Sequence, residues 1–307
     1  MSKVVVVGSY VTDLTARTPK MPRPGETVLG GPFQMGPGGK GGNQAVAAAR
    51  LGASVTMLTK LGKDLFGDDA LKNFEQEGIN TSHIIQTEDE ATGAALIAVD
   101  PTGENMIVVS LGACGTITKD EVASLLTEMT EADVVLLQLE TSMEAIEGTV
   151  DLATELGKPV ILNPAPFQKV PDDVLGKVDY ITPNETEAEE LTGIQVTDDH
   201  SAAEAADALH AYGIEHVIIT LGKGGVYVSS GDIRQRVPGY PVEAVDTTGA
   251  GDAFNGAFSH FLGGGMPLLE ACNMANMAAA LSVTKFGTAP AMPTLKELDA
   301  FNLQQSS

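Results

Sequence analysis

A run of small residues followed by an acid combines an anion-binding loop with a candidate base. Residues 246–256 read DTTGAGDAFNG, and an apolar helical pattern begins at Asp252. Backbone N–H groups at a helix start are unpaired and lie at the positive end of the dipole, so Gly249, Ala250 and Gly251 could hold an anion. An acid there would repel an anion that is merely bound, but it suits a base that deprotonates a hydroxyl while a phosphoryl group is held. The alternative is a helix start with Asp252 as its favourable N-terminal charge.

A second glycine-rich stretch, residues 36–45, reads GPGGKGGNQA. Its spacing matches the dinucleotide-binding pattern, but it follows no strand of a first βαβ unit. Lys40 is followed by Gly41 and not by Ser or Thr, which excludes a P-loop. We interpret the stretch as a bare backbone loop where Lys40 and Asn43 donate to a small polyhydroxylated ligand. A flexible glycine turn is the alternative.

The elements that would position these loops alternate between apolar strands and amphipathic helices. This pattern predicts an α/β fold: a doubly wound, mostly parallel sheet with helices on both faces and ligands at the carboxyl ends of its strands. The predicted strands are 4–7, 55–59, 134–139, 160–162, 180–182 and 217–221. The predicted helices are 43–51, 65–77, 143–156, 201–212, 252–262 and 268–283.

Two regions depart from this alternation. Residues 14–33 are rich in proline and glycine, and residues 93–99 and 105–109 are strand-like runs joined by DPTGE, a good hairpin turn. We predict a small β-sheet lid with strands from about 14–36 and 93–110, within a single domain over 1–307.

The amino-acid composition indicates which partners and which cellular compartment to expect. The 307 residues include 41 acidic and 18 basic side chains, a net charge of −23, which disfavours nucleic acid and anionic membranes as partners. Such a field also opposes polyphosphate binding unless cations offset it, which favours a metal-dependent site. The only cysteines, Cys114 and Cys272, have no metal-ligand or redox spacing, and the apolar run 4–7 is too short for a signal peptide. We therefore expect a cytoplasmic protein.

From Val4 to about Pro293 the chain resembles the ribokinase-like family of carbohydrate kinases, and within it the ribokinase branch. The resemblance is carried by several motifs in order: Gly8-Ser9 with Asp13, PGET at 24–27, GKGGNQA at 39–45, NPAP at 163–166, PNETE at 183–187, TLG at 220–222 and the run 246–256.

The resemblance implies an α/β core with a β lid that often mediates homodimerisation, and ATP-dependent phosphorylation of a primary hydroxyl on a sugar. It implies that Asp252 is the base and that the amides of Gly249, Ala250 and Gly251 form the anion hole. It implies sugar contacts by Val11, Asp13, Gly39, Lys40, Asn43 and Glu140. It implies nucleotide contacts by Asn184, Thr220, Gly222, Gly225, Gly251 and Asn276, with Glu187 near Mg²⁺.

A monovalent cation, usually K⁺, is also typical of ribokinases. The matching positions supply mostly backbone carbonyls, and they are Asp246, Thr248, Ser282, Lys285 and Gly287. A sixth position, serine in some ribokinases, is Ala291 here.

Two positions depart from the family pattern. Ribokinases usually read Gly-Ser-x-Asn-x-Asp where this chain has GSYVTD, so Val11 replaces a polar partner of the sugar. An apolar side chain suits a sugar that lacks a hydroxyl, and we expect that ribose is not strongly preferred over 2-deoxyribose. Cys114 stands where asparagine is common, and we expect it to be a buried structural thiol.

Other functions remain as alternatives. A kinase of nucleosides or phosphorylated sugars is the nearest, although a substrate phosphate would require cations near the lid, where only Arg17, Lys20 and Arg23 occur. A non-catalytic sugar- or nucleotide-binding regulator belongs to a different class, and the intact Asp252 argues against it.

Overall fold

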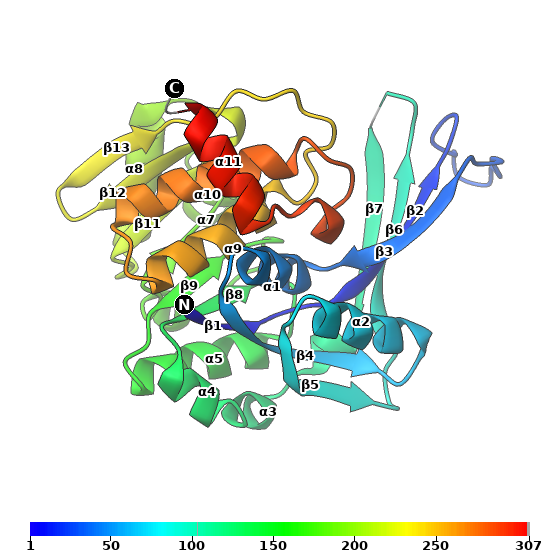
Figure 1. Cartoon of the computed structure of the whole chain (residues 1–307), viewed down its shortest axis with the longest axis horizontal. Helices are drawn as coiled ribbons and strands as arrows, with labels where there is room; N and C mark the ends of the chain where they lie inside the picture. The colour runs from blue at the N-terminus through cyan, green and yellow to red at the C-terminus, as the bar shows by residue number, and fades with distance from the viewer. Residues whose placement is uncertain (103, 306–307) are drawn as a thin grey trace.

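Nine strands form the main sheet of the computed structural model, which describes residues 1–102 and 104–305 (Figure 1). β1 (Lys3–Val7) lies between β4 (Ser54–Gly62) and β8 (Val134–Gln138), and the order is β13-β12-β11-β10-β9-β8-β1-β4-β5. The seven strands from β11 to β5 in this order are parallel, and β12 is antiparallel to both of its neighbours, β11 and β13. The other strands are β5 (Asn80–Thr87), β9 (Val160–Asn163), β10 (Tyr180–Ile181), β11 (His216–Thr220), β12 (Val226–Ser230) and β13 (Ile233–Val237). The predicted mostly parallel sheet is confirmed.

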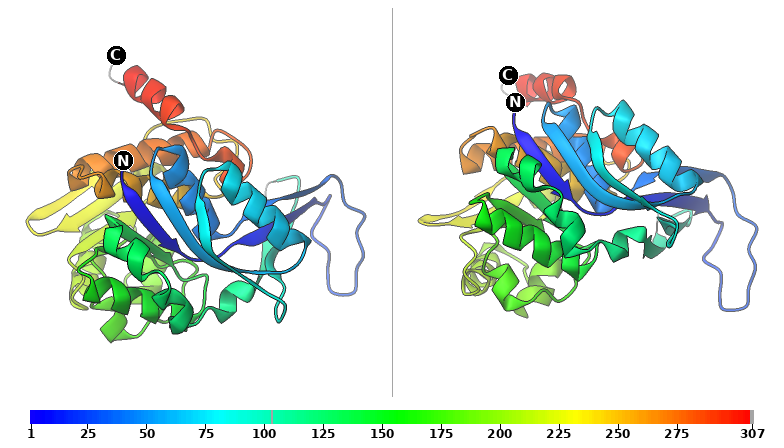
Figure 2. Two further views of the ribbon diagram at one scale, coloured as in Figure 1. Left: turned by 60° about the horizontal axis from the view of Figure 1, so that its bottom comes forward. Right: turned by 90° about the horizontal axis from the view of Figure 1, so that it is seen from below.

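Helices cover both faces of this sheet, which Figure 2 shows in two further views. Successive residues of β1 alternate between two buried clusters: Val4 and Val6 belong to one, Val5 and Val7 to the other. The first cluster packs under α1 (Lys40–Arg50), α2 (Leu65–Gln76), α9 (Ala250–Gly263), α10 (Leu268–Ser282) and α11 (Leu295–Gln305). The second packs under α3 (Lys119–Ala123), α4 (Leu126–Glu131), α5 (Met143–Glu155), α6 (Asp172–Leu175), α7 (Glu185–Thr192) and α8 (Asp199–His210).

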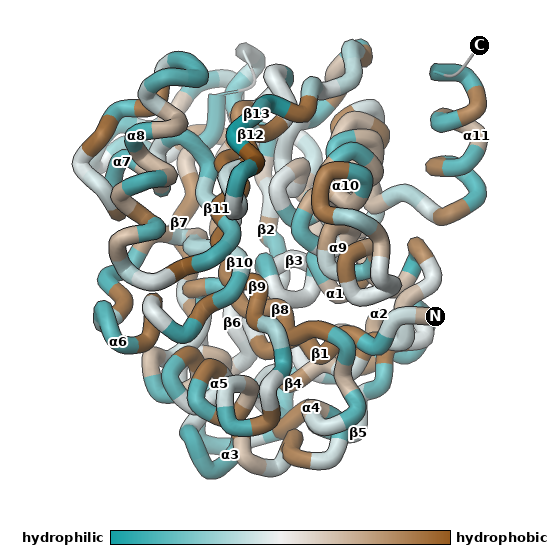
Figure 3. Tube along the Cα trace, turned by 90° about the vertical axis from the view of Figure 1, so that its left-hand side faces the viewer, coloured by the Kyte–Doolittle hydropathy of each residue, from teal (hydrophilic) through white to brown (hydrophobic). Residues whose placement is uncertain are grey.

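This two-sided burial explains the strand sequences. A strand that is covered on both faces needs apolar residues at every position, and the central strands are brown along their length in Figure 3. Within residues 1–102 and 104–305, no helix combines the length and apolar character that a bilayer crossing requires.

A second sheet projects from one edge of the main body (Figure 1). Its order is β3-β2-β6-β7, formed by β2 (Val11–Arg17), β3 (Phe33–Gly38), β6 (Thr92–Val99) and β7 (Asn105–Gly112). The predicted hairpin of 93–99 and 105–109 is confirmed as β6 and β7. The first predicted lid segment corresponds to β2 and β3, although β2 begins earlier, at Val11. Gly103 of the predicted turn and residues 306–307 of the predicted single domain lie outside the described residues.

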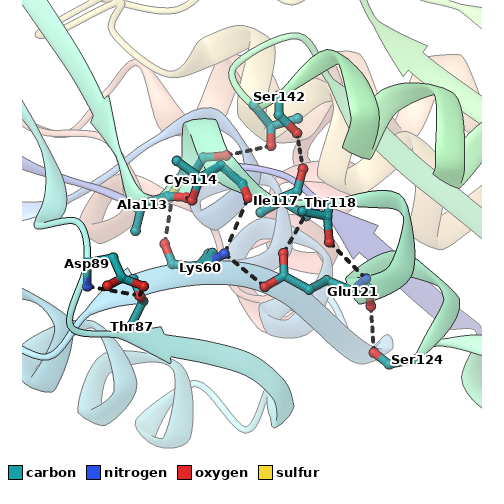
Figure 4. Close-up of polar contacts among 12 residues, drawn as sticks. Lys60, Thr87, Asp89, Ala113, Cys114, Ile117, Thr118, Glu121, Ser124 and Ser142 are labelled. Atoms are coloured by element: carbon teal, nitrogen blue, oxygen red, sulfur yellow. Dashed lines mark hydrogen bonds and ion pairs between the residues drawn. The ribbon is translucent and has the colours of Figure 1, made fainter.

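Polar contacts, of which those of Cys114 are buried, lie where the lid meets the main sheet. The Cys114 thiol, in the short 3-10 turn η1 (Ala113–Thr116) that follows β7, contacts the Tyr10 amide at 3.3 Å and the Lys60 carbonyl at 3.2 Å. The Lys60 ammonium reaches Glu121 at 2.8 Å and the Thr116 carbonyl at 3.3 Å (Figure 4). Cys114 is fully buried, as expected, and burial raises its thiol pKa. This side chain therefore has a structural role. Its raised pKa leaves little of the reactive thiolate form.

Candidate functional site

The carboxyl ends of the central strands open into a pocket of about 390 Å³. Residues from well-separated parts of the chain meet there because parallel strands end at one edge of the sheet. The predicted residues that line the pocket include Lys40, Asn184, Glu187, Gly251, Asp252 and Asn276. The two glycine-rich loops of the sequence therefore meet at one place.

Asp252 lies in the first turn of α9 and is only 6% exposed. One carboxylate oxygen accepts a hydrogen bond from Asn43 Nδ2 at 2.9 Å, and the other accepts one from Gln44 Nε2 at 2.9 Å. Burial raises the pKa of Asp252, and the charge of Lys40 and the two side-chain amides oppose that rise. The result is a fixed, buried carboxyl group, which suits proton transfer.

The backbone just before Asp252 leaves open space for an anion. Gly249 precedes α9 with φ +78°, a conformation that favours glycine, and within the described chain no side chain caps this helix. A Cβ atom at Gly251 would meet no atom within 4 Å. The Ala250 amide donates to the Thr247 carbonyl over a long 3.3 Å. The first turn thus faces an open volume beside the carboxylate of Asp252.

On the lid side, acidic side chains surround Lys40. Glu140 is 6% exposed and accepts hydrogen bonds from the Lys40 amide at 2.8 Å and from the Ser9 hydroxyl. Burial lowers the pKa of the Lys40 ammonium, but the carboxylates of Asp252, Glu140 and Glu187 outweigh it and the net pKa is raised. Lys40 therefore stays cationic among the acids.

Asp13 completes the acidic side of the site. Burial raises its pKa to about 7; a hydrogen bond from Thr288 opposes the shift, and the charges of Glu140 and Asp252 add to it. The Thr288 hydroxyl lies 3.4 Å from the Asp13 carboxylate. Val11 is two residues earlier on β2 and so shares the face of Asp13, where it is 2% exposed.

The loop of Gly39 brings its backbone close to β2. Gly39 has φ +84°, and a Cβ there would lie 2.7 Å from the Val11 amide nitrogen. Helix α1 begins at Lys40, three residues before the predicted start at 43, because the turn at Gly39 delivers the chain directly into helical geometry. Lys40 and Asn43 consequently lie in the first turn of this helix, close to Asp252.

At the opposite end of the pocket, Asn184 caps α7. Its side chain accepts from the Glu187 amide at 2.8 Å, and the Glu187 carboxylate accepts from the Asn184 amide at 2.9 Å, a capping box. Burial raises the pKa of Glu187, although that backbone bond and Lys40 oppose the shift. Thr220, Gly222 and Gly225 also line the pocket. Asn276 donates its side-chain amide to the Val237 and Pro238 carbonyls, each at 3.1 Å, and so holds the adjacent loop.

The residues expected around K⁺ lie in the loop before α9, at the end of α10 and in the loop that follows it. The Asp246 carboxylate accepts from the Thr248 amide at 3.0 Å and from the Gly287 amide at 3.1 Å, which joins the loops. Ser282 turns its hydroxyl onto the Ala279 carbonyl, and the Lys285 ammonium lies 2.6 Å from Glu297. The side chains of Ser282 and Lys285 are thus occupied within the protein, which leaves the Asp246 carboxylate and the backbone carbonyls as possible cation ligands. Ala291 is buried in η3 (Ala289–Ala291) and offers only a methyl group.

Across residues 1–102 and 104–305, no group of three or more His, Cys, Asp or Glu side chains is arranged to hold a metal. A Mg²⁺ ion with its phosphates does not need such a group, because it keeps several waters and one or two carboxylates. The donor chemistry of Glu187 fits that requirement. The carboxylate and carbonyl oxygens around Asp246 fit a hard monovalent cation.

Sequence reasoning missed several residues that support the site. Gln44 and Asn163 occur within the quoted motifs, but no role was predicted for them, and each belongs to the hydrogen-bonded surroundings of Asp252. Thr288, which contacts Asp13, carries no local motif. Gln44 directly follows Asn43, and that position was the only sequence signal for its role. Because successive side chains on a helix point about 100° apart, the sequence suggests different surroundings for the two residues.

Comparison with known proteins agrees with this geometry. The family model for pfkB family carbohydrate kinases matches residues 1–295. The chain is 44% identical over 294 residues to a ribokinase of Haemophilus influenzae, covering 96% of each chain. It is 37% identical to a deoxyribokinase of Salmonella typhimurium, covering 97% of this chain and 98% of that one.

Among solved structures, the fold matches a ribokinase of Arabidopsis thaliana complexed with ribose and ATP. The TM-score is 0.91 at 29% identity, covering 98% of this chain and 99% of that one. Because the family model covers nearly the whole chain and a ribokinase is 44% identical to it, the chain belongs to the pfkB family of carbohydrate kinases.

Proposed function

We propose that this carbohydrate kinase transfers the γ-phosphate of ATP to the primary 5-hydroxyl of a ribose-type pentose. The observation that carries the proposal is Asp252, a buried carboxyl group held by two side-chain amides beside the open space at Gly251. A ribokinase relative at 44% identity and the likeness to a ribose- and ATP-bound structure support the choice of substrate.

In the proposed reaction Asp252 accepts the proton of the sugar hydroxyl as its oxygen attacks the γ-phosphorus in line, and ADP leaves. Phosphoryl transfer depends mainly on positioning and charge stabilisation. The amides of Gly249, Ala250 and Gly251 would stabilise negative charge on the transferred group. Lys40 is cationic in the site and adds to that stabilisation.

Two carboxylates suit the sugar. Asp13 and Glu140 lie on the lid side of Lys40, and an ionised carboxylate accepts hydrogen bonds from adjacent hydroxyls. We propose that they hold the sugar with Gly39, Lys40 and Asn43. The nucleotide would be held by Asn184, Thr220, Gly222, Gly225, Gly251 and Asn276.

We propose a site for each of the two cations that the family resemblance implies, Mg²⁺ and K⁺. Mg²⁺ at Glu187 would supply positive charge to the phosphates of ATP. K⁺ at the loops of Asp246, Thr248, Ser282, Lys285 and Gly287 would supply charge beside the start of α9. The bond from the Gly287 amide to Asp246 supports this location, because it already joins the two loops.

Val11 favours 2-deoxyribose as the second candidate substrate. It lies on the face of β2 that carries Asp13 and offers no hydrogen bond from its side chain. One relative, at 37% identity, is a deoxyribokinase. A nucleoside kinase and a non-catalytic regulator are the remaining alternatives.

The test is ATP-coupled phosphorylation across pentoses, hexoses and nucleosides, with Mg²⁺ and with or without K⁺. Turnover of ribose or 2-deoxyribose, with phosphate on the 5-hydroxyl by NMR, supports the proposal. ATP and sugar binding without turnover of any acceptor would favour the regulator. Higher activity in K⁺ than in Na⁺ supports the cation proposal.

We further propose a homodimer that pairs through the lid, in a cytoplasmic protein without nucleic-acid or membrane partners. The lid exposes apolar side chains on both of its faces. The strand register places five of them on one face (Phe33, Met35, Leu96, Met106 and Val108) and two on the other (Ile107 and Val109). Val108 is 66% exposed, and an uncovered apolar edge strand favours pairing. Sedimentation at a monomer mass would contradict this proposal.

A further inference from the structure

A chain of buried side-chain amides lies behind Asp252. Gln44 Nε2 donates to Asp252 Oδ1 at 2.9 Å and to Asn163 Oδ1 at 3.0 Å. Gln44 Oε1 accepts from Gln138 Nε2 at 2.7 Å, and Asn163 Nδ2 donates to the Thr182 carbonyl at 3.2 Å. Gln44 and Gln138 are fully buried and Asn163 is 6% exposed. Gln44 is therefore not placed to touch a ligand in the pocket.

The main-chain carbonyl of Thr182 determines the direction of this chain. A carbonyl only accepts, so Asn163 must present its NH₂ group to it and its oxygen to Gln44. Gln44 must then present its NH₂ group to Asn163, and the same group reaches Asp252. The reversed amide would place the Gln44 oxygen against two acceptor oxygens. Asp252 is consequently faced by an N–H donor, never by a second acceptor.

We propose that Gln44 is a positioning residue that holds Asp252 as an ionised acceptor aimed into the pocket, with its amide direction fixed by Asn163 and the Thr182 carbonyl. The proposal rests on the proposed role of Asp252 as the base. Burial raises the pKa of Asp252, and the bond from Gln44 is one of the interactions that opposes the rise. Asn43 supplies a second bond, but Asn43 is also expected to bind sugar, whereas Gln44 bonds only within the protein network.

The charged groups around Asp252 make a neutral donor important. Lys40 on α1 favours the ionised carboxyl, and it also interacts with Glu140 and Glu187. Glu187 on α7 and Asp13 on β2 interact with Asp252 as like charges. Among these groups, a single cation, Lys40, is thus shared by several carboxylates. The hydrogen bond from Gln44 adds to the stabilisation of the ionised Asp252 that Lys40 provides.

The test compares Gln44→Met with Gln138→Met. Both remove a fully buried side-chain amide of the same chain, but only Gln44 contacts Asp252. We expect the acid-side fall of kcat/KM to move up by about 1–2 pH units in Gln44→Met, since a hydrogen bond to a charged group is worth about that much in pKa. Raising the pH should restore most of its activity. In Gln138→Met the profile should keep its position, with any loss equal at every pH.

A second readout needs no substrate. The raised pKa of Asp252 means that the native state holds a proton that the unfolded state has lost, so the free energy of unfolding falls as pH rises from the unfolded to the native pKa. In Gln44→Met this fall should extend to higher pH than in Gln138→Met. Gln44→Glu should extend it further, because a second carboxylate then faces Asp252.

The outcomes separate the two proposals. If the wild type phosphorylates no acceptor, the proposed function fails, and the unfolding data still test the effect of Gln44 on Asp252. If Gln44→Met does not fold, Gln44→Glu provides both readouts. Identical pH dependence of unfolding and of kcat/KM in the Gln44 and Gln138 variants would overturn the positioning role.

Discussion

Adding one methyl group at Gly251 should raise stability and abolish most activity. Gly251 lies in the first turn of α9 with an ordinary φ, and a Cβ there meets no atom within 4 Å. Replacing glycine by alanine in a helix stabilises it by about 0.5–1 kcal/mol, because alanine loses less backbone entropy on folding. We therefore expect Gly251→Ala to raise Tm by about 1–3 °C.

In the proposed reaction, the phosphoryl group approaches the backbone through this same empty volume. The new methyl group would displace that group from the Gly251 amide, and loss of one such donor typically costs about 10²–10³-fold in kcat. Gly249→Ala provides the contrast: its φ of +78° makes alanine costly, by about 1–2 kcal/mol, although its Cβ would lie 3.4 Å from the nearest atom.

Tm and kcat are measured on the same preparations, Tm by thermal unfolding and kcat by a coupled assay with saturating sugar and ATP. Gly251→Ala should gain stability and lose kcat, whereas Gly249→Ala should lose stability. Wild-type kcat in Gly251→Ala would refute the anion-hole assignment. A lower Tm in Gly251→Ala would show that the first turn of α9 is not open as described.

Three further outcomes follow from the site. Asp252→Asn should lower kcat by about 10²–10⁴-fold while the fold survives; near wild-type turnover would exclude Asp252 as the base. Val11→Asn should raise the kcat/KM ratio of ribose over 2-deoxyribose by about fivefold or more, since a regained hydrogen bond is worth about 1 kcal/mol or more; an unchanged ratio, as expected for Val11→Ala, would remove Val11 from the specificity argument. Asp13 has its pKa raised to about 7, so the sugar KM should fall as pH rises through about 7. Its contribution to stability has the opposite sign, being lost as pH rises from about 4 to 7, and Asp13→Asn should flatten both dependences.

The sequence predicted the parallel part of the main sheet because its strands are buried on both faces. The runs at 4–7, 134–139 and 160–162 correspond closely to β1, β8 and β9. It missed β5 and β13, which form the two edges of the sheet, and also the buried strand β12, whose run VYVSS ends in two serines. Edge strands are half exposed and mix polar with apolar residues, as in IRQRV of β13, so their pattern is weaker.

The site was predictable where chemistry lies in short motifs, and less so where it depends on tertiary contacts. The loops of Lys40 and Asp252 could be identified from glycine spacing, and both line one pocket. Gln44 and Thr288 act through partners 208 and 275 residues away, and no local pattern encodes such contacts. The assigned roles in binding and catalysis stay predictions.

The central place of β1 has a consequence for how this chain folds. Val4 pairs with Val55 on one side and with Val134 on the other, and α1 packs against α9 more than 200 residues later. Such distant closures make folding slow, and a growing chain exposes the apolar face of α1 until α9 has emerged. The turn before α9 and Asp252, the proposed base, are synthesised late, so a ribosome-bound intermediate contains all the lid strands before it contains Asp252. Mutations that weaken the α1–α9 contact should therefore lower the yield of soluble protein more than they lower the activity of the molecules that do fold.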